Sequence, residues 1–193
     1  EKWSPKVHMF PVSGVSSDDL FLVDRNKSTV KSRTGEFRVL TAGTLIRVKG
    51  FGLAVKAFKL FVEKYPDSKL TIAGDGPEEH RLRSLIHRSR LENSVKLVGA
   101  LPRHDLLSRM ASSDALLFPS LRDGGGTVVI EAMSASKPVV CLDVGGPGLH
   151  ITEECGIKVA PTSPPETAQN LANALERLYL DEGLRDKMGE AGR

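Results

Sequence analysis

The chain has 193 residues, 40% of them hydrophobic and 26% charged, which is typical of one folded globular domain and excludes collagen, coiled coil and extended disorder. A chain of this length forms a core without disulfides or metals. Its 27 basic and 24 acidic residues give a formal charge of +3, which is too small to predict a nucleic-acid partner.

The sequence predicts neither a covalent framework nor a membrane anchor. Cys141 and Cys155 lie fourteen residues apart and outside any CxxC pattern, so we expect two buried thiols. No apolar run approaches the ~20 residues of a membrane-spanning helix. No signal-peptide core follows the charged first residues. We therefore expect a cytoplasmic protein.

Residues 1–36 differ from the rest of the chain. They contain Pro5, Pro11, Gly14 and a polar tract at 13–19, and they show no sustained hydrophobic period. We interpret them as an incoming linker, with a strand near residues 6–10 as an open alternative.

From Phe37 onward, short apolar runs alternate with longer segments of helical period. This alternation is typical of a parallel sheet covered by helices, an α/β fold. The predicted strands are 38–42, 69–73, 95–98, 115–118, 138–142 and 156–159.

Helices are predicted where apolar residues recur at steps of three and four. Pro66 ends the first helix, and Pro164 opens the third, because the first turn of a helix tolerates proline. The last helix is expected to be cut at Arg193. The predicted helical segments are 54–62, 82–86, 164–178 and one from Leu184.

Ligands of an open parallel sheet bind outside the carboxyl ends of its strands, so the turns that follow the strands are candidate sites. Four of these turns are rich in glycine, at 43–50, 74–77, 124–126 and 143–148. The first turn brings Lys49 close to a helix start, where its ammonium can pair with phosphate oxygens. A solvated surface lysine is the alternative.

The turn at 74–77 has the first two glycines of a dinucleotide fingerprint, Gly74 and Gly76. The third glycine of that fingerprint is replaced by Glu79, and Pro77 is predicted to start a helix instead. The sequence therefore disfavours an NAD-dependent oxidoreductase. A tight turn between a strand and a helix is the alternative explanation of these glycines.

The most informative segment follows the fourth strand and contains Asp123, three consecutive glycines and Glu131. Three glycines at a helix start cost backbone entropy, which favours a close approach of a ligand to the backbone. The exposed amides would receive an anion, and Glu131 would accept hydrogen bonds from hydroxyls. Together with the other turns, this indicates a phosphate-bearing, hydroxyl-rich ligand such as a nucleotide sugar. A flexible loop before an ordinary helix is the alternative.

The runs 43–50, 74–78, 98–102 and 123–140 resemble retaining glycosyltransferases of the GT-B class, family 4 type. The resemblance covers residues 37–193. It implies a Rossmann-like donor-binding domain, truncated at its C-terminus, whose N-terminal acceptor domain is absent. It also implies sugar transfer from a nucleoside-diphosphate sugar to a glycan or lipid-linked acceptor in polysaccharide or glycoconjugate biosynthesis, and a fragment that is inactive alone.

By position, the resemblance assigns Lys49 to the donor diphosphate, Asp123 to the donor sugar and Glu131 to the ribose hydroxyls. It makes Lys49 and Asp123 the catalytic residues and places Leu101 beside the base. A UDP-sugar is favoured over a GDP-sugar because residues 99–103 contain no carboxylate to bind guanine. The implied donor-binding residues are Thr44, Arg47, Lys49, Gly74, Leu101, Asp123, Gly124, Gly125, Gly126, Thr127 and Glu131.

Three positions depart from the family pattern. Thr44 stands in place of an arginine that shares the diphosphate with Lys49, and Arg47 is the candidate substitute. Asp123 replaces a longer glutamate, and Gly125 replaces an aromatic residue. These departures leave open a non-catalytic nucleotide-binding or regulatory module.

No metal and no cofactor besides the nucleotide sugar is expected, because the chain lacks the D-x-D sequence of metal-dependent transferases. A basic stretch within 80–90 is interpreted as a solvated helix face. Attraction to anionic lipid headgroups at the inner membrane face is the alternative. Nucleic acid is disfavoured, since no aromatic residues are interleaved for base stacking. The residues of this stretch are His80, Arg81, Arg83, His87, Arg88 and Arg90.

Overall fold

The computed structural model describes residue 16 and residues 36–193. Apart from Ser16 and Glu36, the predicted linker lies outside the described residues, and so does the alternative strand near residues 6–10.

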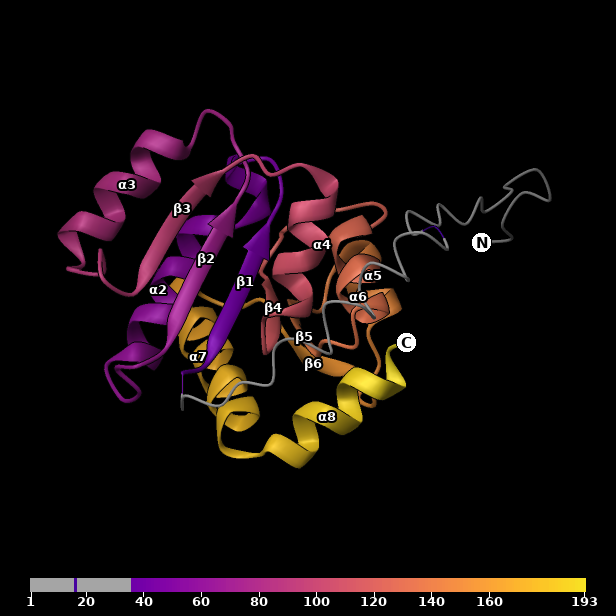
Figure 1. Ribbon diagram of the computed structural model, residues 1–193. Helices are drawn as coiled ribbons and strands as arrows, with labels where there is room; N and C mark the ends of the chain where they lie inside the picture. Colours follow the sequence, from indigo (N-terminus) through magenta and orange to yellow (C-terminus); the bar gives the residue numbers. More distant parts are fainter. Residues whose placement is uncertain (1–15, 17–35) are drawn as a thin grey trace, which may run out of the picture.

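The centre of the fold is a six-stranded sheet in the order β3-β2-β1-β4-β5-β6, and every pairing is parallel (Figure 1). This confirms the predicted α/β class and all six strands. The fifth strand begins one residue later than predicted, because Pro138 has no amide hydrogen to donate to the ladder. The strands are β1 (Arg38–Ala42), β2 (Lys69–Ala73), β3 (Val95–Gly99), β4 (Ala115–Phe118), β5 (Val139–Leu142) and β6 (Gly156–Val159).

Helices follow the strands, and their ends differ from prediction at several points, among them the last helix, which ends at Ala191 and does not run to Arg193. The helix at 103–111 was not predicted. The helix that follows β2 begins at Glu79 rather than at Pro77. The Glu78 amide donates to the Leu45 carbonyl (2.9 Å), and this hydrogen bond holds Pro77 in a turn. The last helix begins two residues before Leu184, whose amide is capped by the Asp181 carboxylate at 2.8 Å. The helices are η1 (Arg47–Lys49), α2 (Phe51–Val62), α3 (Glu79–Arg88), α4 (Arg103–Ala111), α5 (Thr127–Ser134), α6 (Gly145–His150), α7 (Pro164–Leu180) and α8 (Glu182–Ala191).

Residues 143–148, predicted as a turn, contain the start of the short helix α6. Its backbone lies against the loop that precedes α5: the Gly146 amide donates to the Asp123 carbonyl at 2.9 Å. A Cβ atom at Gly146 would lie 2.4 Å from the Gly124 carbonyl oxygen. Glycine is therefore required by this close packing, and the helix forms in spite of its low helix propensity.

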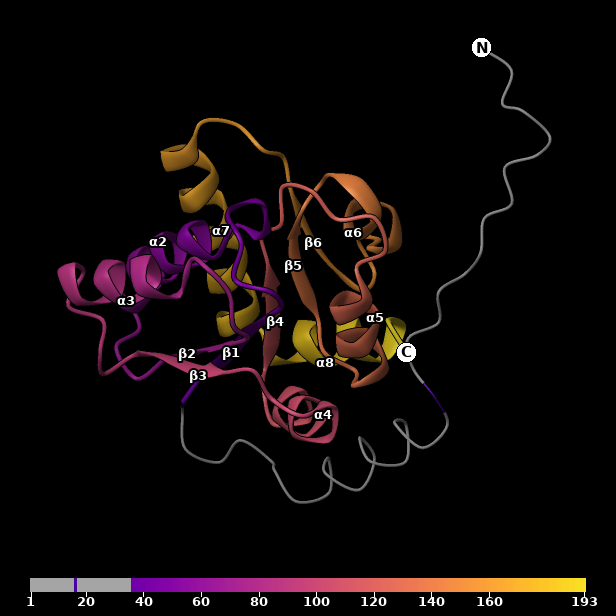
Figure 2. The ribbon, with the colours of Figure 1, turned by 90° about the horizontal axis from the view of Figure 1, so that it is seen from above.

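Two helical layers cover the sheet. Seen from above, α2, α3 and α7 lie on one side of the strands, and α4 and α5 lie on the other (Figure 2). Phe58, Phe61 and Leu175 fill the first layer, whereas Leu107 and Met110 fill the second, and all five are at most 1% exposed. Burial on both faces explains why the central strands β4 and β5 are continuous apolar runs.

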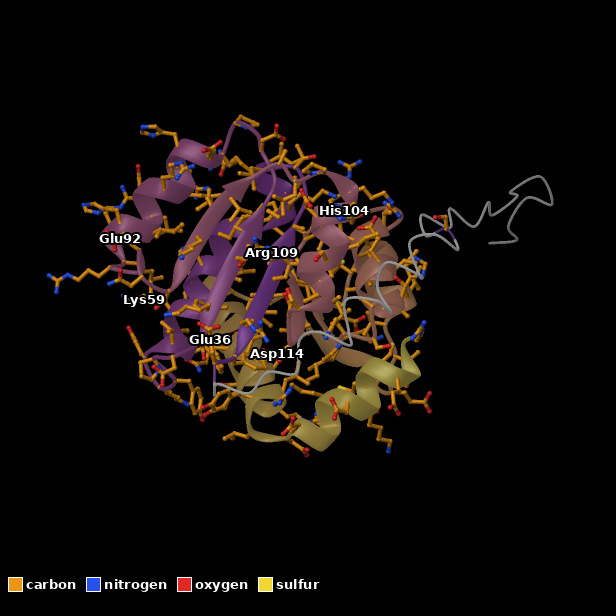
Figure 3. The ribbon with its side chains drawn as sticks, in the orientation of Figure 1. Glu36, Lys59, Glu92, His104, Arg109 and Asp114 are labelled. Atoms are coloured by element: carbon orange, nitrogen blue, oxygen red, sulfur yellow. The ribbon has the colours of Figure 1, made fainter. Side chains whose placement is uncertain are left out.

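The amino and carboxyl edges of the sheet differ in character. At the amino edge, the Arg38 amide donates to the Asp114 carboxylate at 2.7 Å, and Figure 3 shows Asp114 at this edge while His104 lies toward the opposite one. The carboxyl edge carries the glycine-rich turns, and these turns bind one another. The Leu45 amide donates to the Asp75 carbonyl at 2.7 Å, and the Leu121 amide donates to the Val48 carbonyl at 2.8 Å.

A substitution at Gly74 tests the close packing of these turns. The φ of Gly74 is +141°, and a Cβ atom there would lie 1.9 Å from the Gly43 carbonyl oxygen. We expect Gly74→Ala to lower the free energy of unfolding by more than about 2 kcal/mol, measured by urea unfolding. Gly124→Ala is the control, because a Cβ atom there meets nothing within 4 Å. Equal stability of the two variants would contradict the close packing of these turns.

Candidate functional site

The carboxyl edge brings together two residues that are 74 positions apart in sequence, Lys49 and Asp123. Lys49 ends η1, and Asp123 lies in the loop between β4 and α5. The Lys49 ammonium donates a hydrogen bond to Asp123 Oδ2 and lies 5.9 Å from the centre of the Phe118 ring. The two side chains are only 23% and 12% exposed. The residues expected to bind the diphosphate and the donor sugar thus bind each other.

The second oxygen of Asp123 binds the glycine segment. Asp123 Oδ1 accepts hydrogen bonds from the amides of Gly125 (3.2 Å) and Gly126 (2.7 Å). Gly126 has a φ of 57° and precedes the first residue of α5, Thr127. The amides expected to receive a ligand anion are therefore occupied by a carboxylate of the chain itself. This carboxylate also lies at the positive end of α5.

These contacts change the acidity of Asp123. Partial burial opposes its ionisation, but the hydrogen bond from Lys49 and those from the Gly126 and Gly125 amides outweigh burial. The pKa of Asp123 is therefore lowered from its ordinary value. The carboxylate is the form that the fold stabilises.

Glu131 lies on α5 and is 3% exposed. Arg103, the first residue of α4, donates a hydrogen bond to Glu131 Oε1, and the Arg103 side chain is 45% exposed. The sequence predicted a role for Glu131 but none for Arg103. The only signal was its position directly after the segment 98–102, on which the family resemblance partly rests.

The other predicted residues have varied positions. Leu101 is partly buried and packs against the core cluster under α4 and α5. Gly74 donates its amide to the Gly99 carbonyl at 2.7 Å, which accounts for it without a ligand. Arg47 lines a groove that does not include Lys49. The exposed members of the set are Thr44, Arg47, Gly124, Gly125 and Thr127.

Both cysteines are buried and free, as expected. Burial, assisted by the nearby Asp143 charge, raises the pKa of the Cys141 thiol to about 12. Among residue 16 and residues 36–193, no three histidine, cysteine or acidic side chains gather into a group that could hold a metal ion. No helix in the described part of the chain has the length and apolar character needed to cross a membrane.

The lowered pKa of Asp123 predicts a pH dependence of stability. A carboxyl whose pKa is lower in the folded state stabilises the fold above its unfolded pKa of about 4, and this contribution is lost as pH falls through the folded pKa. We expect Asp123→Asn to reduce the loss of unfolding free energy between about pH 5 and pH 3. Urea unfolding across this range measures it. Asp67→Asn, at an exposed turn, is the control, and an unchanged pH dependence in Asp123→Asn would contradict the prediction.

A double-mutant cycle tests the pair of Arg103 and Glu131. Arg103→Ala removes a cation from a buried carboxylate, so we expect a loss of about 1 to 2 kcal/mol in unfolding free energy. In Arg103→Ala/Glu131→Gln the loss should be smaller than the sum of the single losses. Arg109→Ala, exposed on the same helix, should stay within about 0.5 kcal/mol of the parent. Strict additivity would show that the pair is not coupled.

Known proteins similar to this chain are transferases. This chain is 31% identical to an alpha-D-kanosaminyltransferase of Streptomyces kanamyceticus over 153 residues. The aligned region covers 79% of this chain and 39% of that protein. The chain therefore spans about two fifths of the length of this relative.

Two solved structures show the same fold. The pneumococcal O-GlcNAc transferase in complex with UDP and GlcNAc gives a TM-score of 0.78 at 22% identity, over 86% of this chain and 32% of that one. The C-terminal domain of a glycosyl transferase group 1 family protein from Francisella tularensis gives a TM-score of 0.73 at 20% identity, over 94% of this chain and 92% of that one.

The family model described as glycosyl transferases group 1 matches residues 23–193. This confirms the resemblance to GT-B glycosyltransferases, while the retaining, family 4 subtype stays a prediction. The match includes β1 to β6 and the turns that carry Lys49, Asp123 and Glu131. The chain belongs to the glycosyl transferases group 1 family.

Proposed function

We propose that this chain is the donor-binding half of an enzyme that transfers a sugar, with retention, from a UDP-sugar to a glycan or lipid-linked acceptor. The observation that carries the proposal is the meeting of Lys49, Asp123 and the glycine amides at the carboxyl edge of the sheet. This chain is a group 1 glycosyl transferase, and at this edge it brings a cation, amide donors and a carboxylate close together.

The hydrogen bonds of Asp123 suggest how a donor would bind. A diphosphate carries more negative charge than the Asp123 carboxylate, so it would compete with Asp123 for the Lys49 ammonium. Asp123, released from Lys49, would then be free to accept hydrogen bonds from the donor sugar. We propose that Lys49 and Asp123 change partners on donor binding.

The same groups would assist the transfer step. The bond between the anomeric carbon and the diphosphate oxygen breaks, the acceptor oxygen bonds to that carbon, and the acceptor's proton passes to the departing diphosphate. The growing charge on the departing nucleoside diphosphate would be stabilised by Lys49, by the amides of the glycine segment and by the positive end of α5. These groups belong to the chain itself, so the proposal includes no metal.

The nucleoside would lie toward α4. Glu131 would accept hydrogen bonds from the ribose hydroxyls, which requires it to share its carboxylate with Arg103 or to release it. Leu101 would contact the base. UDP is supported by the lack of a carboxylate in residues 99–103 and by the UDP complex of the pneumococcal protein.

The remaining parts of the proposal concern the whole protein. Since the chain spans about two fifths of the kanosaminyltransferase and nearly all of a C-terminal domain from Francisella, we propose that residues 37–193 form such a domain. The acceptor site would then lie in an N-terminal domain, and this chain alone would bind donor without transferring sugar. We place the enzyme in the cytoplasm, where polysaccharide or glycoconjugate precursors would be elongated.

A thermal-shift panel tests donor binding, with UDP, GDP, ADP, NAD and UDP-sugars as ligands. A ligand at 100 times its Kd stabilises a fold by about 2.7 kcal/mol, which raises Tm by several degrees. We expect the rise with UDP and with UDP-sugars, to an extent that depends on the attached sugar, and we expect Lys49→Ala to abolish it. Lys59→Ala is the matched control, because Lys59 is an exposed lysine of α2 whose ion-pair partner is Glu63. The Tm of each variant without ligand shows whether it folds.

Other outcomes of the panel separate the alternatives. A rise with GDP alone would correct the base, and equal binding of UDP and UDP-sugars would favour a nucleotide-binding module. A rise with NAD alone would overturn the proposed function.

A further inference from the structure

The outer surface of α2, between α3 and the start of α7, is hollowed into a groove of about 630 Å³. Figure 2 shows these three helices on the same side of the sheet. The groove is lined by η1, by the first two turns of α2, by α3 and by the segment 161–167. Lys49, Asp123 and Glu131 are not among its lining residues. It therefore excludes the Lys49–Asp123 pair, although Arg47, one of the implied donor-binding residues, belongs to its lining.

The groove concentrates positive charge. Four cationic side chains line it, from three different elements, against a single carboxylate, Glu78. Glu78 already binds Arg81. In the described part of the chain, no carboxylate lies within ion-pair distance of the other three cations, Arg47, Lys56 and Arg88. Like charges that line one groove repel one another, and a bound anion would relieve that repulsion.

Arg81 and α2 form the floor of the groove. A Cβ atom at Gly52 would lie 3.8 Å from Arg81 Nη1 and 4.0 Å from Leu85 Cδ2, so the Arg81 guanidinium lies across the beginning of α2. The first turn of α2 contains no acidic residue. The positive end of that helix therefore adds to the charge of the four side chains.

Apolar side chains complete the walls. Leu53 and Leu85 are partly buried beside the cations, and Leu121 stands at the rim with 55% of its surface exposed. A ligand with an apolar portion next to its charged group would cover this surface. A small inorganic ion alone would leave the walls in water.

We propose that this groove binds the phosphate group of an amphiphilic ligand. Arg47, Lys56 and Arg88 approach from three elements, which suits the several oxygens of a phosphate better than the two of a carboxylate. The apolar walls receive the chain attached to the phosphate. Two sources share this chemistry, a soluble phosphate ester and the headgroup of an anionic phospholipid.

Two charge-matched double variants of the 193-residue chain test the site. Lys56→Gln/Arg88→Gln removes two cations from the groove. Lys59→Gln/Arg90→Gln also removes two cations, but from outside the groove. Lys59 lies on α2, like Lys56, and Arg90 lies two residues after the end of α3. Both variants lower the net charge by the same amount. Their Tm values without ligand show whether each one folds.

The probes separate the two sources. Hexyl phosphate is titrated by calorimetry, and vesicles of equal parts phosphatidylcholine and phosphatidylglycerol are used in a sedimentation assay beside vesicles of phosphatidylcholine alone. We expect Lys56→Gln/Arg88→Gln to weaken binding at least about tenfold, by loss of two charge-assisted contacts. Lys59→Gln/Arg90→Gln should bind like the parent. Binding of hexyl phosphate alone assigns a soluble ester, and binding of the anionic vesicles assigns a lipid headgroup.

Three results would overturn the proposal. The first is that neither probe binds the parent chain. The second is an equal loss in both double variants, which would indicate a diffuse basic surface rather than a site. The third is a loss in Lys49→Ala as large as in Lys56→Gln/Arg88→Gln, which would place the phosphate at the donor site. The Lys49 comparison also separates this proposal from the proposed function, since either can fail while the other holds.

Discussion

The site depends on one carboxylate, that of Asp123. One of its oxygens binds the Lys49 ammonium, and the other accepts from the amides of Gly125 and Gly126. Its backbone carbonyl accepts from the Gly146 amide. A single residue therefore joins the turn after β1, the glycine segment before α5 and the start of α6. Each contact pairs a charge or a dipole with its opposite, so the contacts support one another.

In this arrangement, charged groups of the chain itself bind the residues that are proposed to hold the donor. The chain supplies a negative charge where the diphosphate is proposed to lie, and Arg103 supplies a positive charge at Glu131, where the ribose is proposed to lie. Internal partners of this kind compensate buried and partly buried charges. In the proposed function, donor binding would be an exchange of partners, and its affinity would reflect the difference between two sets of contacts.

The central strands β1, β4 and β5 could be predicted from the sequence because each is a largely apolar run buried on both faces, and such runs keep their character in any parallel sheet. Prediction was weaker where local signals conflict with packing. The glycine-rich residues 143–148 have low helix propensity and read as a turn, yet residues 145–150 form α6 against the loop at 123–125. Pro77 read as a helix start, but a hydrogen bond from Glu78 to Leu45 delays α3 until Glu79. Both outcomes come from contacts between residues distant in sequence.

The sequence by itself determined the α/β class, the six strands, the glycine-rich edge and the family, because these follow from local composition and motif order. Only the tertiary structure decided that Lys49 binds Asp123, that Arg103 binds Glu131 and that Arg47 lines a groove with Lys56 and Arg88. A motif fixes which residue follows a strand, but the partner of a long, flexible side chain depends on which turns the sheet brings together. For Lys49 and Asp123 those turns are 74 residues apart in the chain and adjacent only through the pairing of β1 with β4.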